Sequence, residues 1–117
     1  MNFSGFVVHG DGEGTGLGFP TANLDVLLDL DPGVYAVWVV VAGERLPGVI
    51  CSGALGGGGA YKCEVHLLDF VGDLYGQKLE VEVVGGRLSE IRHISDREAL
   101  RKKIEQDIRM TRTALDL

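Results

Sequence analysis

A run of glycines near the N-terminus is the first segment of this sequence that could bind a substrate. Residues 10–18 read Gly-Asp-Gly-Glu-Gly-Thr-Gly-Leu-Gly, so that glycine recurs at Gly10, Gly12, Gly14, Gly16 and Gly18. Glycine lets backbone N–H groups approach an anion closely, and such a loop could cradle phosphate oxygens. The same pattern is also typical of a flexible surface hairpin. The residues alone leave both interpretations open.

Oxygen donors follow the glycine run. Thr21 and Asn23 come directly after Pro20 and offer a hydroxyl and an amide carbonyl. Both are hard ligands that suit Mg²⁺. Threonine and asparagine are equally common in turns after proline, so the residue types also fit a plain turn.

A carboxylate stands in the middle of a predicted strand further along the chain. Glu64 shares one face of that strand with His66 and Leu68. An unpaired carboxylate at such a position is costly, so Glu64 is a candidate general base. The alternative is a glutamate on a solvent-facing strand. No two histidines have metal-ligand spacing, so the residues alone favour interpreting His66 as a hydrogen-bonded side chain.

Length and composition narrow the class of protein. The chain has 117 residues, 45% hydrophobic and 24% charged, which predicts one globular domain over residues 1–117. A net charge of −6 argues against nucleic acid as the main partner. No apolar run reaches the ~18 residues of a membrane span. Cys51 and Cys63 are expected to be reduced thiols, and no targeting extension is expected because Met1 stands directly ahead of the first predicted strand. We expect a cytoplasmic monomer that does not contact membranes.

The chemistry-bearing residues have to be positioned by short strands. Alternating or β-branched runs predict strands over residues 3–9, 34–41, 46–52, 61–70 and 78–84. The 34–41 run is apolar throughout, which indicates a strand covered on both faces. Residues 42–45 have the composition of a hairpin turn.

The last third of the chain is predicted to be helical over about 96–115. Ser95 and Glu98 fit a capping box, in which each side chain bonds the other residue's amide. An apolar stripe with near-helical spacing follows, formed by Leu100, Ile104, Ile108 and Leu115. Short strands followed by one amphipathic helix predict a mainly β fold: a closed antiparallel barrel over about 1–93, with the helix covering an opening or a flank.

Three segments together resemble the riboflavin kinase (flavokinase) family. Residues 5–23 run from Gly-Phe-Val-Val-His-Gly through the glycines to Pro-Thr-Ala-Asn, and residues 33–36 read Gly-Val-Tyr-Ala. Residues 64–76 run from Glu-Val-His-Leu-Leu-Asp-Phe to Gly-Asp-Leu-Tyr-Gly. The order and spacing of these segments agree over nearly the whole chain, which makes the combination far more specific than a lone glycine loop.

That resemblance implies a six-stranded Greek-key barrel with a C-terminal helix. It also implies an enzyme that uses ATP and a divalent cation such as Mg²⁺ to phosphorylate riboflavin, giving flavin mononucleotide (FMN) and ADP. Many bacterial members carry an adenylyltransferase domain ahead of this one. By position, Glu64 matches the catalytic base, Thr21 and Asn23 match the metal ligands, and the glycine loop with Pro20 surrounds phosphate. Tyr75 and Gly76 match a turn bordering the flavin. The resemblance adds a second interpretation of His66, as a residue that lines the nucleotide pocket.

Some positions depart from the family pattern. The first 44 residues contain no Lys or Arg, and the glycine loop carries Glu13 where members usually carry basic residues. Residues 51–59 replace an Asn-Ile-Gly segment and a Pro-Thr-Phe flap with Cys-Ser-Gly-Ala-Leu and four glycines. Ser89 stands where the family has an arginine near the flavin, and Arg87 or Arg92 is the expected substitute.

These departures keep two alternatives to a kinase in view. One is a non-catalytic flavin- or nucleotide-binding module on the same barrel. It predicts tight binding of a flavin without turnover. The other is a barrel used for protein contacts, which predicts no binding of either ligand. Fold alone does not decide among the three.

Overall fold

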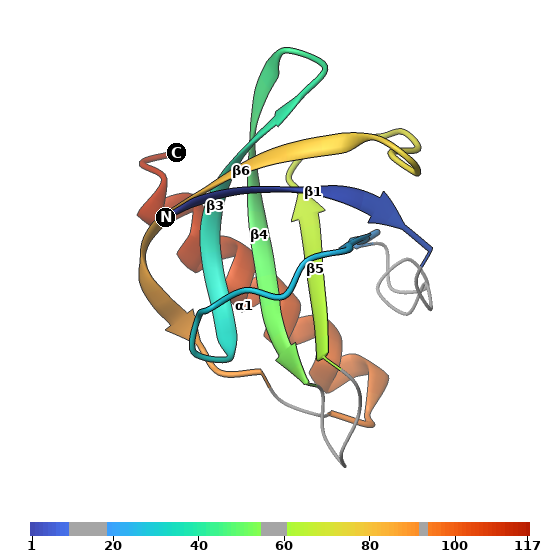
Figure 1. Cartoon of the computed structure of the whole chain (residues 1–117). Helices are drawn as coiled ribbons and strands as arrows, with labels where there is room; N and C mark the ends of the chain where they lie inside the picture. The colour runs from blue at the N-terminus through green and yellow to red at the C-terminus, as the bar shows by residue number, and fades with distance from the viewer. Residues whose placement is uncertain (10–18, 55–60, 92–93) are drawn as a thin grey trace.

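Six strands close into a barrel, and one helix covers part of its outer face (Figure 1). The computed structural model describes residues 1–9, 19–54, 61–91 and 94–117. In chain order the elements are β1 (Asn2–Val8), β2 (Ala22–Leu24), β3 (Gly33–Val41), β4 (Glu44–Ala54), β5 (Tyr61–Leu67), β6 (Lys78–Ser89) and α1 (Arg97–Ala114).

The strands follow one another around the barrel in the order β1-β2-β5-β4-β3-β6, and every neighbouring pair is antiparallel. Strands β3, β4 and β5 are consecutive, and β6 returns to lie beside β3. That arrangement is a Greek key. The predicted closed six-stranded barrel with one C-terminal helix is therefore confirmed.

Alternation along the strands separates the barrel interior from its outer face. On β5, Cys63, Val65 and Leu67 are buried, while the residues between them remain partly exposed. The interior also holds Ile50 of β4 and Leu79 of β6, which are fully buried. Each such side chain contributes about 1.5–3 kcal/mol by leaving water.

Strand β3 is buried on both faces, as its apolar run predicts. Its inward side chains fill the barrel, while α1 packs across the outer side of β3, β4 and β6 (Figure 1). Ala42 and Gly43 form the two-residue hairpin turn to β4 with φ of 50° and 83°. Positive φ at both positions matches the twist of the flanking strands.

The start of the helix differs from the prediction. The N-cap is Asp96 rather than Ser95, and it makes no side-chain capping hydrogen bond, so the capping box is wrong. The helix begins one residue later than the capping box requires, at Arg97. Its most buried residues are Asp107 and Thr111, both polar, between the partly buried apolar positions. Thr111 donates from Oγ1 to the Asp107 carbonyl at 2.8 Å, which satisfies its hydroxyl one turn back along the helix.

None of the helices in the described part of the chain has the length and apolarity needed to span a bilayer.

Candidate active site

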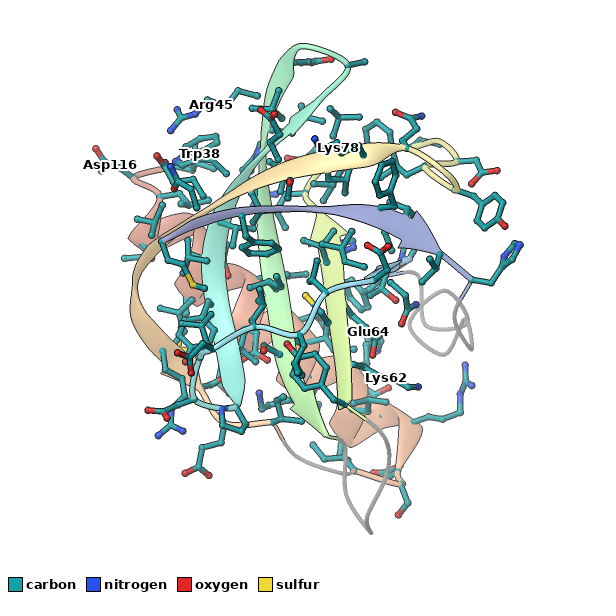
Figure 2. All side chains as sticks on the ribbon, in the orientation of Figure 1. Trp38, Arg45, Lys62, Glu64, Lys78 and Asp116 are labelled. Carbon is teal, nitrogen blue, oxygen red and sulfur yellow. The ribbon has the colours of Figure 1, made fainter. Side chains whose placement is uncertain are left out.

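The outer face of β5 carries two polar side chains of the candidate site. Glu64 and His66 alternate with the buried Cys63, Val65 and Leu67, so both project out of the barrel and are partly exposed. Figure 2 shows Glu64 projecting from β5 on the side away from the barrel interior. The backbone period of two residues therefore puts the carboxylate and the imidazole on one surface.

Strand β2 brings the oxygen donors to the same surface. Ala22 pairs with Val65 and Asn23 pairs with Glu64, so Asn23 and Glu64 are direct cross-strand neighbours. Thr21 lies two residues before Asn23 and shares its face. Its Oγ1 donates a hydrogen bond to Glu64 Oε2 at 3.0 Å. The structure thus brings the predicted base and both predicted metal ligands together.

The sequence did not predict β2. Thr21 and Asn23 were equally compatible with a turn, yet Ala22–Leu24 is a strand whose Leu24 is buried in the core. Three residues are too few to show a period-two pattern, and Pro20 directly before them is a turn signal. The pairing of this segment with β5 is decided by tertiary packing.

His66 contacts the segment that precedes β2. Its Nδ1 lies 2.8 Å from the Pro20 carbonyl oxygen, and its ring meets the Phe19 ring edge-on with centroids 5.9 Å apart. The carbonyl can only accept, so Nδ1 carries the hydrogen. In this structure His66 is a hydrogen-bonded side chain, which is one of the two predicted roles.

A cavity of about 210 Å³ opens beside β2. Its walls include Thr21, Asn23, His9 and Tyr75. The His9 and Tyr75 rings are stacked, with centroids 3.8 Å apart, and Tyr75 is 54% exposed. The predicted turn residue Gly76 has φ of +80°, and its amide donates to the Val7 carbonyl at 3.0 Å. The turn that carries Tyr75 is thereby fastened to β1, at the rim of this cavity.

The Cys51 thiol lies next to the Glu64 carboxylate, on strand β4, which pairs with β5 along the edge opposite to β2. Cys51 of β4 pairs with Glu64 in the register and is partly exposed. Burial, followed by the negative charges of Asp107 and Glu64, raises the pKa of the Cys51 thiol to about 12. Cys51 is therefore protonated at neutral pH and presents no competing anion beside Glu64.

A polar cluster joins the end of β6 to α1. Ser89 Oγ donates to Asp107 Oδ1 at 2.7 Å, and Lys103 Nζ lies 3.1 Å from Ser89 Oγ and 2.6 Å from Asp107 Oδ2. Sequence reasoning missed Lys103 and Asp107. Their i, i+4 spacing on the predicted helix is a signal, but it indicates only that they are neighbours there.

Arg87 and Arg92 are the two arginines expected to substitute for the family's arginine at position 89. Arg87 donates from Nη1 to the Pro32 carbonyl at 3.2 Å, and its aliphatic stem covers Gly33. The cation that contacts Ser89 in the described part of the chain comes from α1. Arg92, the other candidate, lies outside the described residues.

The predicted phosphate loop also lies outside the described residues. This applies to Gly10, Gly12, Gly14, Gly16 and Gly18, and to Glu13 within the same loop. Pro20 is described, and its carbonyl is the acceptor for His66.

The assembled groups suit transfer of a charged group to a hydroxyl. The Thr21 hydroxyl and the Asn23 amide are hard oxygen donors that fit a divalent cation already carrying phosphate or water ligands. Within the described ranges, no group of three or more His, Cys, Asp or Glu residues gathers as a metal cluster. Glu64 supplies a carboxylate on the same surface, able to take a proton from an incoming alcohol.

Known proteins match nearly the whole length of this chain. The family model for riboflavin kinase, also called flavokinase, matches residues 1–115. A bifunctional riboflavin kinase/FMN adenylyltransferase of Pseudomonas fluorescens is 40% identical over 117 residues, covering 96% of this chain and 37% of the relative. An RNA-binding riboflavin kinase of Bacillus subtilis is 37% identical over 109 residues, covering 90% of this chain and 47% of the relative. The chain thus spans less than half the length of either relative.

Two solved structures share the fold. The riboflavin kinase of Trypanosoma brucei superimposes with a TM-score of 0.68 at 25% identity, covering 98% of this chain and 79% of that one. A structure described as a macrolide-efflux protein of Streptococcus pneumoniae superimposes with a TM-score of 0.82 at 28% identity. This chain covers 38% of the latter, and 95% of this chain is matched.

Proposed function

Because the chain belongs to the riboflavin kinase family, we propose that it transfers the γ-phosphoryl group of ATP to the terminal ribityl hydroxyl of riboflavin, giving FMN and ADP. The observation that carries the proposal is the hydrogen bond of 3.0 Å between Thr21 Oγ1 and Glu64 Oε2. It joins a candidate metal ligand, in the segment directly before β2, to a candidate base on β5.

In the proposed reaction Glu64 is the catalytic residue. The ribityl oxygen attacks the γ-phosphorus as the bond to the β,γ-bridging oxygen breaks, and ADP leaves. The proton of the ribityl hydroxyl passes to a Glu64 carboxylate oxygen. Since Glu64 is partly exposed, the proton can then pass to water.

Thr21 has two roles in this proposal. Its hydroxyl donates to Glu64 and so orients the carboxylate. The same oxygen keeps lone pairs free for a cation. We propose that Thr21 and Asn23 would hold Mg²⁺, which when bound neutralises charge on the phosphates. We assign the phosphates themselves to the glycine loop with Pro20, and we propose that Tyr75 and Gly76 border the bound ligand beside it.

We also propose that residues 1–117 act as one riboflavin kinase-like domain, as a monomer in the cytoplasm, without nucleic acid. The net charge of −6 supports the last point, since a phosphate backbone is attracted to basic surfaces. Because a relative is named as RNA-binding, an RNA-binding assay beside size-exclusion chromatography is the direct check.

The decisive experiment replaces the base and keeps its shape. Glu64→Gln retains an oxygen that can accept from Thr21 but cannot take the proton, so we expect kcat for FMN formation to fall about 10²–10⁴-fold with folding unchanged. Glu80→Gln, an exposed glutamate on β6, is the matched control and should keep wild-type activity. Flavin binding without turnover in the wild-type protein, or a Glu64→Gln variant as active as the control, would contradict the proposal.

A further inference from the structure

The segment that carries Thr21 is held to β5 by very few backbone pairs. The β2–β5 register has two, Ala22 with Val65 and Asn23 with Glu64. Continuing that register by one residue sets Thr21 opposite His66, where β2 has not yet begun. Pro20, one residue further back, has no N–H and cannot add a donor to the sheet.

The His66 side chain provides a contact at the point where the register ends. Its Nδ1 donates to the Pro20 carbonyl at 2.8 Å, and the Phe19 ring packs edge-on against the imidazole. Glu64, two residues earlier on the same face of β5, accepts from the Thr21 hydroxyl. Two β5 side chains therefore hold consecutive residues of the same short segment.

We propose that His66 is a positioning residue, which fixes the Pro20 carbonyl and thereby holds Thr21 in hydrogen-bonding reach of Glu64. The inference rests on the proposed function, in which Thr21 is a metal ligand and Glu64 is the general base. It assigns His66 no direct contact with the nucleotide. Its action passes through the backbone of residues 20 and 21.

The chemistry of the contact defines what can replace His66. A carbonyl oxygen accepts a hydrogen whether the imidazole is neutral, with its hydrogen on Nδ1, or doubly protonated. The essential feature is an N–H donor at the Nδ1 position. Asparagine carries its amide nitrogen at nearly the same distance from Cβ, whereas alanine has no donor and glutamine places its nitrogen one bond further out.

The test compares His66→Ala, His66→Asn and His66→Gln, with the exposed β6 variant Glu80→Ala as control. For His66→Ala we expect KM for ATP to rise about 3- to 10-fold, corresponding to the loss of roughly one hydrogen bond, while KM for riboflavin changes less. His66→Asn should stay within about twofold of the wild type, and His66→Gln should resemble His66→Ala.

A second measurement does not depend on activity. Amide hydrogen exchange of residues 21–24 in the ligand-free protein should quicken in His66→Ala and remain slow in His66→Asn, with the rest of the barrel unchanged. If His66→Asn loses as much as His66→Ala in both measurements, or if neither variant alters exchange, the positioning role is refuted. If the wild type forms no FMN but the exchange pattern is as expected, the proposed function fails and the positioning role stands.

Discussion

Removing Lys103 tests whether the cluster between α1 and β6 stabilises the fold. The Lys103 and Asp107 side chains are only 16% and 10% exposed, with Nζ and Oδ2 2.6 Å apart. Lys103→Met keeps the length and the apolar stem of the side chain but leaves the Asp107 carboxylate buried without its cation. Ser89 still donates to that carboxylate at 2.7 Å.

The magnitude follows from this partial compensation. Removing one partner of a buried ion pair costs about 3–5 kcal/mol. The surviving Ser89 hydrogen bond and the residual solvent contact reduce that cost, so we expect the free energy of unfolding to fall by about 2–3 kcal/mol. For a chain of this size the melting temperature should fall by about 10 °C.

The assay is urea denaturation monitored by Trp38 fluorescence, beside an Arg101→Met control on the same helix. Arg101 pairs with Glu98 and Glu105 at the surface, where all three side chains are at least 40% exposed. Exposed pairs contribute little, so the control should leave the unfolding midpoint unchanged. Equal losses in the two variants, or no loss in Lys103→Met, would refute the reasoning from burial.

Two further predictions concern stability. Burial raises the pKa of Cys51 and of Cys63 from 9.0 to about 12, so both thiols stay protonated in the folded chain while the unfolded chain releases those protons. Stability should therefore fall as pH rises from 9 towards 12, and urea midpoints of a double Cys→Ala variant should fall less over that window. Gly53→Ala should lower the melting temperature by several degrees because its φ is +142° and a Cβ would lie 2.8 Å from Pro32 Cβ. Gly43→Ala, also at positive φ but with open space around it, should lower it less.

The barrel could be predicted from local patterns. Most strands have clear period-two or β-branched runs, and the apolar run of β3 indicates correctly that both faces are covered. The hairpin after β3 follows from Ala42 and Gly43, since glycine readily adopts positive φ. Strand closure was an inference from the number of strands and the single helix, and the observed strand order confirms it.

The parts that the sequence missed depend on partners distant in the chain. Strand β2 exists because residues 22–24 pair with β1 and β5, which no local pattern records. The buried face of α1 includes Asp107, which hydropathy assigns to solvent. Its burial depends on Lys103 from the same helix and Ser89 from β6. The predicted capping box failed for a different, local reason: a four-residue motif does not by itself fix where a helix begins, and the N-cap is Asp96.

In the candidate site, too, some residues could be predicted from the sequence and the position of others could not. The resemblance proposed Glu64, Thr21 and Asn23 as one site, and the sheet register makes them neighbours. Their roles stay predictions until the variants are assayed. The contact of the Arg87 side chain could not be predicted, because a long side chain near a strand end can reach several acceptors. In the structure it donates to the Pro32 carbonyl.

The shortness of β2 has a consequence for how the protein holds its ligands. Strand β2 is the shortest of the six strands and has two register pairs with β1 and two with β5. The free energy needed to detach it is therefore a fraction of the free energy of global unfolding. A ligand that contacts both β2 and β5 would stabilise the pairing of these two strands. Part of the intrinsic binding free energy would then be used to order β2. The measured affinity would therefore change with any substitution that weakens or strengthens the β2–β5 pairing, including substitutions far from the ligand.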